Sequence, residues 1–298
     1  MKSRTRIAAF LAALLAIILV LAACSSDDEP AVAKTLYIGG IPDQDVTVLQ
    51  TRFNGMADYL TTATGIPTKY VPSNDYAAVV TAFKQGDIPL AFFGGLTGVQ
   101  ARLSVPGANA IAQRAIDEHF TSVFVAQKGL GIKTLADLKG KTFTFGSESS
   151  TSGYTMPLYF LSEAKLDPKR DFSAVSFSGS HDRTWKLVET GAFQAGVLNA
   201  SVWNTRVRNN EIDLTKVEVF YTTPEYYDYH WVARPDLDKS FGTGATDKIT
   251  NALLALNAAA NDQQKALMTA FQDTKFVPTN NANYAKLETV ARGLGIIQ

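Results

Sequence analysis

A run of hydroxyl side chains stands in the middle of the sequence. The stretch GSESSTSGYTMPLYF, residues 146–160, places five hydroxyls between Ser147 and Ser152 and then a glycine, Gly153. A strand-like segment precedes it and a helix-like pattern follows, so these hydroxyls belong to a helix start. The first N–H groups of a helix lack internal partners and carry partial positive charge. Hydroxyl donors and a close-approaching glycine would complete an anion site without formal charge.

The alternative is a serine N-cap with incidental loop serines. One capping hydroxyl requires no ligand. Four consecutive hydroxyls, Ser149, Ser150, Thr151 and Ser152, favour the anion site instead.

Two further helix starts carry donors. His181 follows another predicted strand and could donate to an oxyanion, or it could be exposed beside a capping Ser180 or Asp182. Tyr76 opens a helix capped by Asp75, and its hydroxyl could face a crevice or its ring could pack on a sheet.

Two segments add weaker candidates. In FFGGLTG, Gly95 and Thr97 open a helix after a buried strand and could present amides to an anion. In PEYYDYHW, Tyr229 and His230 could wall a ligand cleft or form a rigid hinge.

Enzymatic motifs are missing from the sequence. No G-x-S-x-G elbow occurs, and adjacent His181 and Asp182 cannot form a serine triad alone. The GKT at 140–142 lacks the earlier glycine of a phosphate-binding loop. The three histidines are not at metal-ligand spacing, so we expect no metal and no cofactor.

The N-terminus is a targeting signal. Basic Lys2, Arg4 and Arg6 precede 17 apolar residues that end at the only cysteine, Cys24. Leu21-Ala22-Ala23-Cys24 resembles a bacterial lipobox, which implies cleavage before Cys24 and lipid on its sulfur. The alternative is an uncleaved signal anchor. We expect a lipid-anchored, extracytoplasmic protein, with residues 1–23 as signal peptide and 24–33 as tether.

Composition and element order indicate two α/β lobes. The chain has 298 residues, 46% hydrophobic and 19% charged, and its net charge of zero argues against nucleic-acid binding. Strands and helices alternate twice without a flexible linker, which predicts two parallel sheets covered by helices. We expect residues 34–124 plus 225–298 to form the first lobe and 125–224 the second. The two strand crossings between them would form a hinge, with the ligand in the crevice at the strand ends.

Three stretches carry a family resemblance: STSGY, GSHD and DYAAVVTAFKQGDIPLAFFGG. They resemble the phosphate/phosphite/phosphonate-binding proteins of ABC importers, over about residues 34–297. The resemblance implies a type II periplasmic-binding-protein fold and a small oxyanion as ligand. It also implies a monomer that delivers this ligand to a permease and its ATPase, with no catalysis by this chain.

The resemblance also implies site residues. Ser150, Thr151 and Ser152 match the family's oxyanion-binding hydroxyls, His181 its ligand histidine and Tyr76 its first-lobe tyrosine. The chain departs from the pattern of phosphonate binders in three segments, HFTSVF, LNASVW and YDYHW. In phosphonate binders such segments include the acidic residues that hold a ligand's amino group, so aminoalkyl phosphonates are disfavoured as ligands.

The ligand itself stays open at this stage. The combination of motifs also resembles a branch assigned to selenate, so a selenate- or sulfate-type anion is an alternative. A carboxylate facing the ligand, from Asp228 or Asp182, would instead favour a protonated anion. An extracellular enzyme or a sensor module are the alternatives from other classes.

Overall fold

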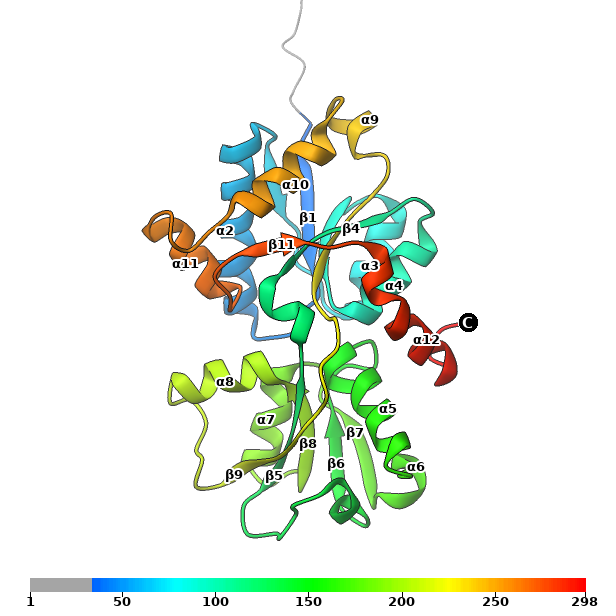
Figure 1. Cartoon of the computed structure of the whole chain (residues 1–298). Helices are drawn as coiled ribbons and strands as arrows, with labels where there is room; N and C mark the ends of the chain where they lie inside the picture. Colours follow the sequence, from blue (N-terminus) through cyan, green and yellow to red (C-terminus); the bar gives the residue numbers. More distant parts are fainter. Residues whose placement is uncertain (1–33) are drawn as a thin grey trace, which may run out of the picture. The chain divides into compact units, whose positions relative to one another are not determined.

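The computed structural model describes residues 34–298, which form two sheets with helices around each (Figure 1). The elements around the six-stranded sheet are called lobe 1, and those around the five-stranded sheet lobe 2. In lobe 1 the strand order is β11-β4-β10-β3-β1-β2, with bounds β1 Leu36–Gly40, β2 Thr68–Tyr70, β3 Leu90–Phe93, β4 Asn109–Arg114, β10 His230–Ala233 and β11 Phe276–Pro278. In lobe 2 the order is β7-β6-β8-β5-β9, with bounds β5 Ser122–Gln127, β6 Thr142–Phe145, β7 Ala174–Phe177, β8 Ala195–Asn199 and β9 Val217–Thr222.

Both sheets are mixed, which corrects the expectation of parallel sheets. The strands β1, β2 and β3 pair in parallel, but β10 lies antiparallel between β3 and β4. In lobe 2, β6 is parallel to β7 and β8, whereas β5 is antiparallel to β8 and β9. The antiparallel members include β5 and β10, which enter their sheets from the other lobe. The strand β11 was not predicted, because its three residues end in a proline and carry little periodicity.

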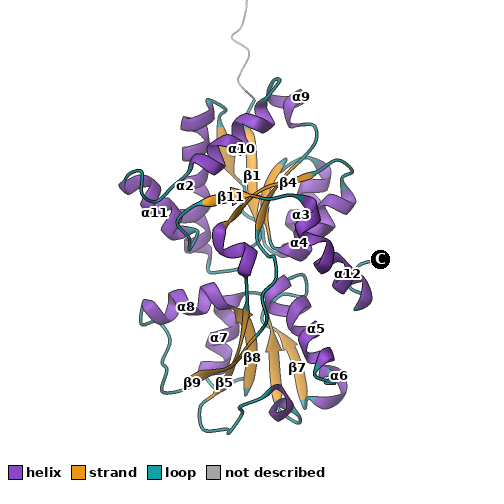
Figure 2. Ribbon diagram, in the orientation of Figure 1, coloured by secondary structure: helices purple, strands orange, loops and turns teal. Residues whose placement is uncertain are grey.

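Helices cover the faces of both sheets (Figure 2). Those of lobe 1 are α2 Val46–Thr64, α3 Tyr76–Gln85, α4 Gly95–Ser104, α9 Leu237–Phe241, α10 Ala245–Ala255, α11 Asp262–Ala270 and α12 Ala285–Gly293. Those of lobe 2 are α5 Met156–Glu163, α6 Pro168–Asp171, α7 His181–Glu189 and α8 Ala200–Arg208. Short 3-10 turns lie at η1 Ala115–His119, η2 Leu135–Leu138 and η4 Asn281–Tyr284, and a π-helical turn lies at η3 Thr151–Thr155. No helix within residues 34–298 is long and apolar enough to cross a membrane.

The helix α2 shows how sequence fixes these elements. Its apolar side chains Leu49, Phe53, Met56 and Leu60 recur at helical spacing and are all buried, as predicted. The helix ends at Gly65, whose φ of 70° lies in the left-handed region that glycine adopts at low cost.

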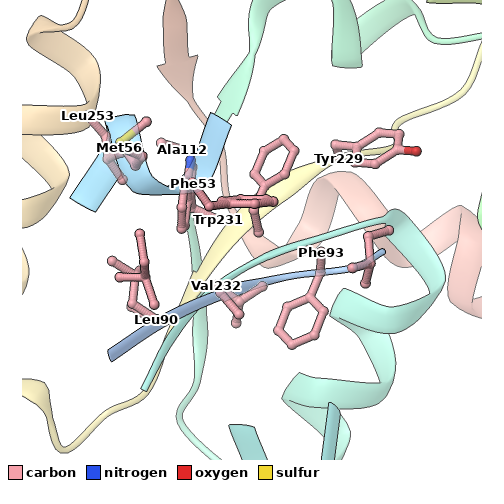
Figure 3. Packing of buried hydrophobic residues seen from close by; sticks show 14 of the residues in the cluster. Phe53, Met56, Leu90, Phe93, Ala112, Tyr229, Trp231, Val232 and Leu253 are labelled. Atoms are coloured by element: carbon pink, nitrogen blue, oxygen red, sulfur yellow. The ribbon is translucent and has the colours of Figure 1, made fainter. Parts of the chain in front are cut away.

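Each lobe has its own core, and the lobe 1 core extends to Met156 of α5 in lobe 2. In lobe 1, aromatic rings of α2, β3 and β10 pack around Trp231, with Phe53 and Phe92 in contact with it (Figure 3). Tyr229 lies at the end of this cluster, and its hydroxyl points away from the other labelled rings (Figure 3). Apolar residues of lobe 2 form two clusters, one around Phe143 and one around Trp185.

Two chain segments connect the lobes side by side, between β4 and β5 and between β9 and β10 (Figure 1). Phe120 and Tyr226 form an antiparallel bridge between them. The hydroxyl of Ser122 donates to the carbonyl of Ser152 at 2.7 Å, so the Tyr226 hydroxyl donates to Ser122 at 2.6 Å. These bonds tie the connecting segments to the hydroxyl run.

Candidate functional site

The loop after β6 leads into a π-helical turn. This turn, η3, precedes α5, whereas the sequence predicted a single α-helix over 152–164. Ser150 is its N-cap, and its Oγ accepts a hydrogen bond from the Gly153 N–H at 2.9 Å. Single π-helical turns are rare and are frequent at functional sites. Ser150 therefore acts as the helix N-cap that the alternative interpretation predicted. The hydroxyls beside it are not explained by capping.

The neighbouring hydroxyls have different surroundings. Thr151 Oγ1 accepts a hydrogen bond at 2.9 Å from the N–H of Leu96, in lobe 1. Ser152 is 1% exposed, and its Oγ has no hydrogen-bond partner within residues 34–298. Ser149 is half-buried, and its N–H donates to the Ser147 Oγ within the loop. The structure therefore bonds Thr151 to lobe 1, buries the Ser152 hydroxyl without a partner among the described residues, and leaves Ser149 in the loop.

Gly153 packs closely between a hydroxyl and an imidazole, where a side chain would be crowded. A Cβ at Gly153 would lie 3.0 Å from the Ser150 Oγ and 3.2 Å from the His181 Cε1. His181 opens α7 after Ser180, whose hydroxyl caps that helix. Two sequence signals thirty residues apart therefore meet at one place, as the anion interpretation requires.

The glycine turn of lobe 1 is already occupied by protein oxygens. The N–H of Gly95 donates to Asp228 Oδ1 at 2.8 Å, and the next amide, of Leu96, donates to Thr151. The Thr97 hydroxyl donates back to the Gly94 carbonyl at 3.1 Å. Gly95 and Thr97 were predicted to present donors to an anion. In the structure, these donors are instead bonded to Asp228 and to the Gly94 carbonyl.

Asp228 is the carboxyl group of this cluster. It is 1% exposed, and its Oδ2 has no hydrogen-bond partner in the described part of the chain. Burial raises the pKa of Asp228 to about 7, and the bond from Gly95 opposes that shift. At neutral pH this group can therefore either donate or accept a proton.

Asp182, the other carboxylate singled out from the sequence, is engaged elsewhere. It forms a buried ion pair with Arg206, with nitrogen–oxygen distances of 2.8 and 2.7 Å, and accepts the N–H of Asp45. Burial raises its pKa, but the Arg206 partner prevails and the net shift is downward. Asp182 is thus a structural anion that joins the lobes.

Tyr76 stands at the start of α3. Asp75 caps this helix by accepting the Ala78 N–H at 2.8 Å, as the sequence predicted. The tyrosine is 2% exposed and its hydroxyl has no hydrogen-bond partner among the described residues. Burial raises its pKa well above the ordinary value, Asp43 adds to the shift, and the nearby Ser150 hydroxyl opposes it. Tyr76 is therefore a neutral donor close to the hydroxyl run.

His181 and Tyr229 lie in one hydrogen-bond network. The Asn199 N–H donates to His181 Nδ1 at 3.4 Å, which makes the other ring nitrogen, Nε2, the donor to Tyr229 at 3.2 Å. Burial lowers the pKa of His181, so the ring is neutral. The Tyr229 hydroxyl donates to Asp43 Oδ2 at 3.0 Å and accepts from the Asn199 amide at 3.1 Å. Tyr229 is saturated by protein groups, and sequence reasoning did not identify Asp43 and Asn199.

His230 lies away from this cluster. Its Nε2 contacts the Arg102 guanidinium at 2.6 Å, and its ring stacks on Tyr284 with centroids 3.8 Å apart. A Cβ at Gly98 would collide with the ring, so the imidazole fills the space behind α4. The His230 ring therefore lies with Arg102 and Tyr284, whereas Tyr229, the residue before β10 begins, joins the network of His181.

The cluster holds its donors without an unpaired cation. The buried arginines pair with carboxylates: Arg52 with Asp43 at 3.5 Å, Arg114 with Asp117 at 2.7 Å, and Arg206 with Asp182. Within residues 34–298 no group of three or more His, Cys, Asp or Glu side chains could hold a metal ion. The site can therefore bind a ligand through hydrogen bonds from neutral donors and through the titratable carboxyl of Asp228.

The fold and this site define a two-lobed binding protein for a small polar ligand. The family model of periplasmic substrate-binding proteins of phosphonate ABC transporters matches residues 38–284. The chain belongs to this family and is the extracytoplasmic substrate-binding component of a transporter. Its relatives are transport binding proteins.

Two curated relatives place the chain within the family. A probable ABC transporter phosphite-binding protein, PhnD1 of Prochlorococcus marinus (strain MIT 9301), is 42% identical over 272 residues, covering 89% of this chain and 91% of that protein. The phosphate-import protein PhnD of Mycolicibacterium smegmatis is 28% identical over 195 residues, covering 60% of this chain and 61% of its own length.

Solved structures confirm the type II periplasmic-binding-protein fold. The structure of PhnD1 in complex with methylphosphonate matches with a TM-score of 0.86 and covers 89% of this chain and all of that one. A binding component of a phosphonate ABC transporter from Pseudomonas aeruginosa is 20% identical with a TM-score of 0.76, covering 87% and 85% of the two chains, and supports the fold alone.

Proposed function

We propose that the protein binds a singly protonated tetrahedral phosphorus oxyanion, of the phosphite or methylphosphonate type, between lobes 1 and 2. Ser150, Thr151 and Ser152 supply hydroxyl donors from lobe 2, and His181 Nε2 donates to the ligand in exchange for its bond to Tyr229. Tyr76 and Asp228 complete the site from the side of lobe 1. Lobe 1 then comprises residues 34–121 and 225–298, and lobe 2 residues 122–224, with the two connections as hinge. The predicted boundary at residue 124 moves to 121, because β5 begins at Ser122 in the five-stranded sheet.

One observation carries this proposal. Eight buried side-chain atoms have no hydrogen-bond partner within the described residues, although such groups are normally satisfied. Three of them, Ser152 Oγ, Tyr76 Oη and Asp228 Oδ2, belong to the proposed site. Two are hydroxyl donors and the third belongs to a carboxyl with a pKa of about 7. That set matches an anion that both accepts hydrogen bonds and shares one proton.

The relatives support the same ligand class. PhnD1 is named for phosphite and was solved with methylphosphonate, and the mycobacterial relative is named for phosphate. Sulfate and selenate carry no proton at neutral pH, so they require Asp228 itself to be protonated. We therefore propose sulfate and selenate as ligands only after the phosphorus oxyanions.

Calorimetry with the mature chain tests the ligand class. We expect methylphosphonate or phosphite to bind more tightly than sulfate and selenate at pH 8, and none of these compounds to be converted to product. Absence of binding by every phosphorus oxyanion would overturn the proposal. Product formation would instead favour an extracellular enzyme.

We also propose that the mature protein is a monomer held at the membrane by lipid on Cys24, which lies outside the described residues. The Cys24→Ala variant should then be released from membranes or accumulate as the precursor. A variant of mature length that still fractionates with membranes would refute the anchor. The matched control is Ser25→Ala, which keeps the cysteine.

A further inference from the structure

A buried ion pair in the first connecting segment contacts the backbone of Asp228. Asp117 belongs to the turn η1 and is 0% exposed. Arg114 donates to its carboxylate through two nitrogens, with Nε 2.8 Å from Oδ2 and Nη2 2.7 Å from Oδ1. The third nitrogen of the guanidinium donates to the Phe271 carbonyl at 2.9 Å. These bonds fix the position of Asp117, which the proposed function does not use.

Asp117 holds the peptide groups beside the Asp228 side chain. Its carbonyl accepts the Asp228 N–H at 3.2 Å, and its Oδ1 accepts the N–H of Tyr229 at 3.2 Å. The Asp228 carbonyl accepts the Nδ1–H of His230 at 2.9 Å, and Asp228 Oδ1 accepts the N–H of Gly95. Asp228 Oδ2 has no partner among residues 34–298, so the bonds to the other polar atoms of Asp228 decide where it points.

The ion pair also contributes to the electrostatics of Asp228. Burial is the largest influence on the pKa of Asp228 and raises it, while the bond from Gly95 lowers it. The negative charge of Asp117 raises this pKa further, because it opposes a second negative charge nearby. The bond from Thr151 lowers it, and Arg114 has an opposite and smaller effect than Asp117.

The other titratable groups near Asp228 are neutral between pH 6 and 8. Burial lowers the pKa of His230 well below its ordinary value. Burial raises the pKa of the four neighbouring tyrosines well above the ordinary value: Tyr76, Tyr226, Tyr229 and Tyr284. Asp117 and Arg114 are therefore the charges whose removal would shift the titration of Asp228.

We infer that Asp117 is a positioning residue for the ligand, which directs Asp228 Oδ2 toward the anion and favours the sharing of a proton between them. Arg114 holds Asp117 in this position. The inference rests on the proposed function and identifies the group that controls the carboxyl of the site.

Asp117→Asn tests the charge and keeps the size of the side chain. Carbon-13 NMR of the aspartate carboxyl groups in the unliganded protein follows the titration of Asp228, whose signal is absent from Asp228→Asn. Arg114 then favours ionised Asp228 without opposition from Asp117, so the midpoint pH should fall by about one unit or more. Sulfate affinity at pH 8 should fall about tenfold for each unit of this shift, whereas methylphosphonate affinity should be kept.

Asp273→Asn is the matched control. Asp273 accepts the Ile116 N–H of the same turn at 2.8 Å, so this variant removes a carboxylate beside η1 and leaves Asp117 in place. The midpoint for Asp228 in this variant should equal that of wild type.

The double variant Asp117→Asn with Arg114→Gln serves if Asp117→Asn does not fold, because loss of both members of a buried ion pair is tolerated better than loss of one. Its midpoint should also fall, but by less than in the single variant, since Asp117 has the larger effect. A midpoint equal to or above that of wild type in a folded variant overturns the inference, and so does an equal fall in Asp273→Asn. Failure of wild type to bind methylphosphonate would count against the proposed function instead.

Discussion

Two helix starts face each other across the lobes. Their sequences are similar, but the groups that bond to their donors differ. In lobe 1, the amides of Gly95 and Leu96 at the start of α4 are bound by Asp228 and Thr151. In lobe 2, the turn at Thr151–Thr155 keeps the Ser152 hydroxyl buried and without a partner among the described residues. Glycines and hydroxyls after a strand therefore mark a donor-rich helix end, but the opposing surface decides whether a ligand or the protein uses it.

Thr151 joins the two helix starts, so its removal should have the largest effect. Thr151→Val keeps the shape of the side chain and removes the hydroxyl that faces Leu96. Affinity for methylphosphonate should fall roughly 10- to 150-fold, the equivalent of a hydrogen bond to a charged group. Titration calorimetry measures this change. An affinity equal to that of wild type would mean that the hydroxyl run is only a helix cap.

Asp228 should control how binding depends on pH. Sulfate needs this group protonated, so its affinity for wild type should fall about tenfold for each pH unit above 7. Asp228→Asn removes the titration, and the advantage of methylphosphonate over sulfate at pH 8 should shrink accordingly. Affinities at pH 6 and pH 8 for both ligands test this. A pH dependence for sulfate that survives in Asp228→Asn would contradict it.

Asp228 should also affect the stability of the unliganded protein. Its pKa is raised above the ordinary value of 3.8 to about 7, so the folded state binds the proton more strongly than the unfolded state does. That stabilisation is complete below pH 3.8 and is lost as pH rises toward 7. Without ligand, Asp228→Asn should therefore melt above wild type at pH 8, with a difference that narrows as pH falls. Thermal unfolding followed by circular dichroism measures both.

Tyr229 should affect closure more than ligand contact. Tyr229→Phe removes the hydroxyl that joins Asp43 to His181 and Asn199, and each lost net hydrogen bond costs about 1 kcal/mol of unfolding free energy. Denaturant unfolding should show this loss, and small-angle scattering should show less compaction by saturating methylphosphonate than in wild type. Compaction and stability equal to wild type would remove Tyr229 from the closure network.

The smallest effects are expected at two predicted site residues whose bonds stay local. Ser149→Ala alters a loop hydroxyl, and Thr97→Val removes a bond that stays within α4. Both should bind methylphosphonate within about twofold of wild type, as surface or locally bonded changes usually do. A loss above tenfold in either would show that the cluster is wider than described.

The comparison also shows what sequence could and could not predict. The helix starts at Tyr76, Thr151 and His181 follow from local signals, namely capping residues, glycine and apolar spacing. The partners of their donors depend on contacts across long separations, such as 133 residues between Gly95 and Asp228. Neither periodicity nor capping rules carry that information.

Neighbouring residues show a similar limit. Tyr229 and His230 were predicted together from their aromatic types, yet Tyr229 bonds to His181 and Asp43 whereas His230, the first residue of β10, contacts Arg102. The π-helical turn was also missed, because its hydroxyls and glycine are equally compatible with an ordinary helix start. The family resemblance identified the hydroxyl trio and His181 as candidates but not the network formed by Asp43 and Asn199.

The bonds between the lobes have a consequence for the kinetics of transport. The His181 N–H donates to the Asp43 carbonyl and the Asp45 N–H to Asp182, so these contacts do not pass through a ligand. They favour the closed form of the free carrier as well, and only the open fraction can admit an anion. Apparent affinity is then weakened in proportion to that fraction. Closed binding proteins without an anion would also compete for the permease with those that hold one. The uptake rate would then depend on the ratio of empty to anion-bound closed protein.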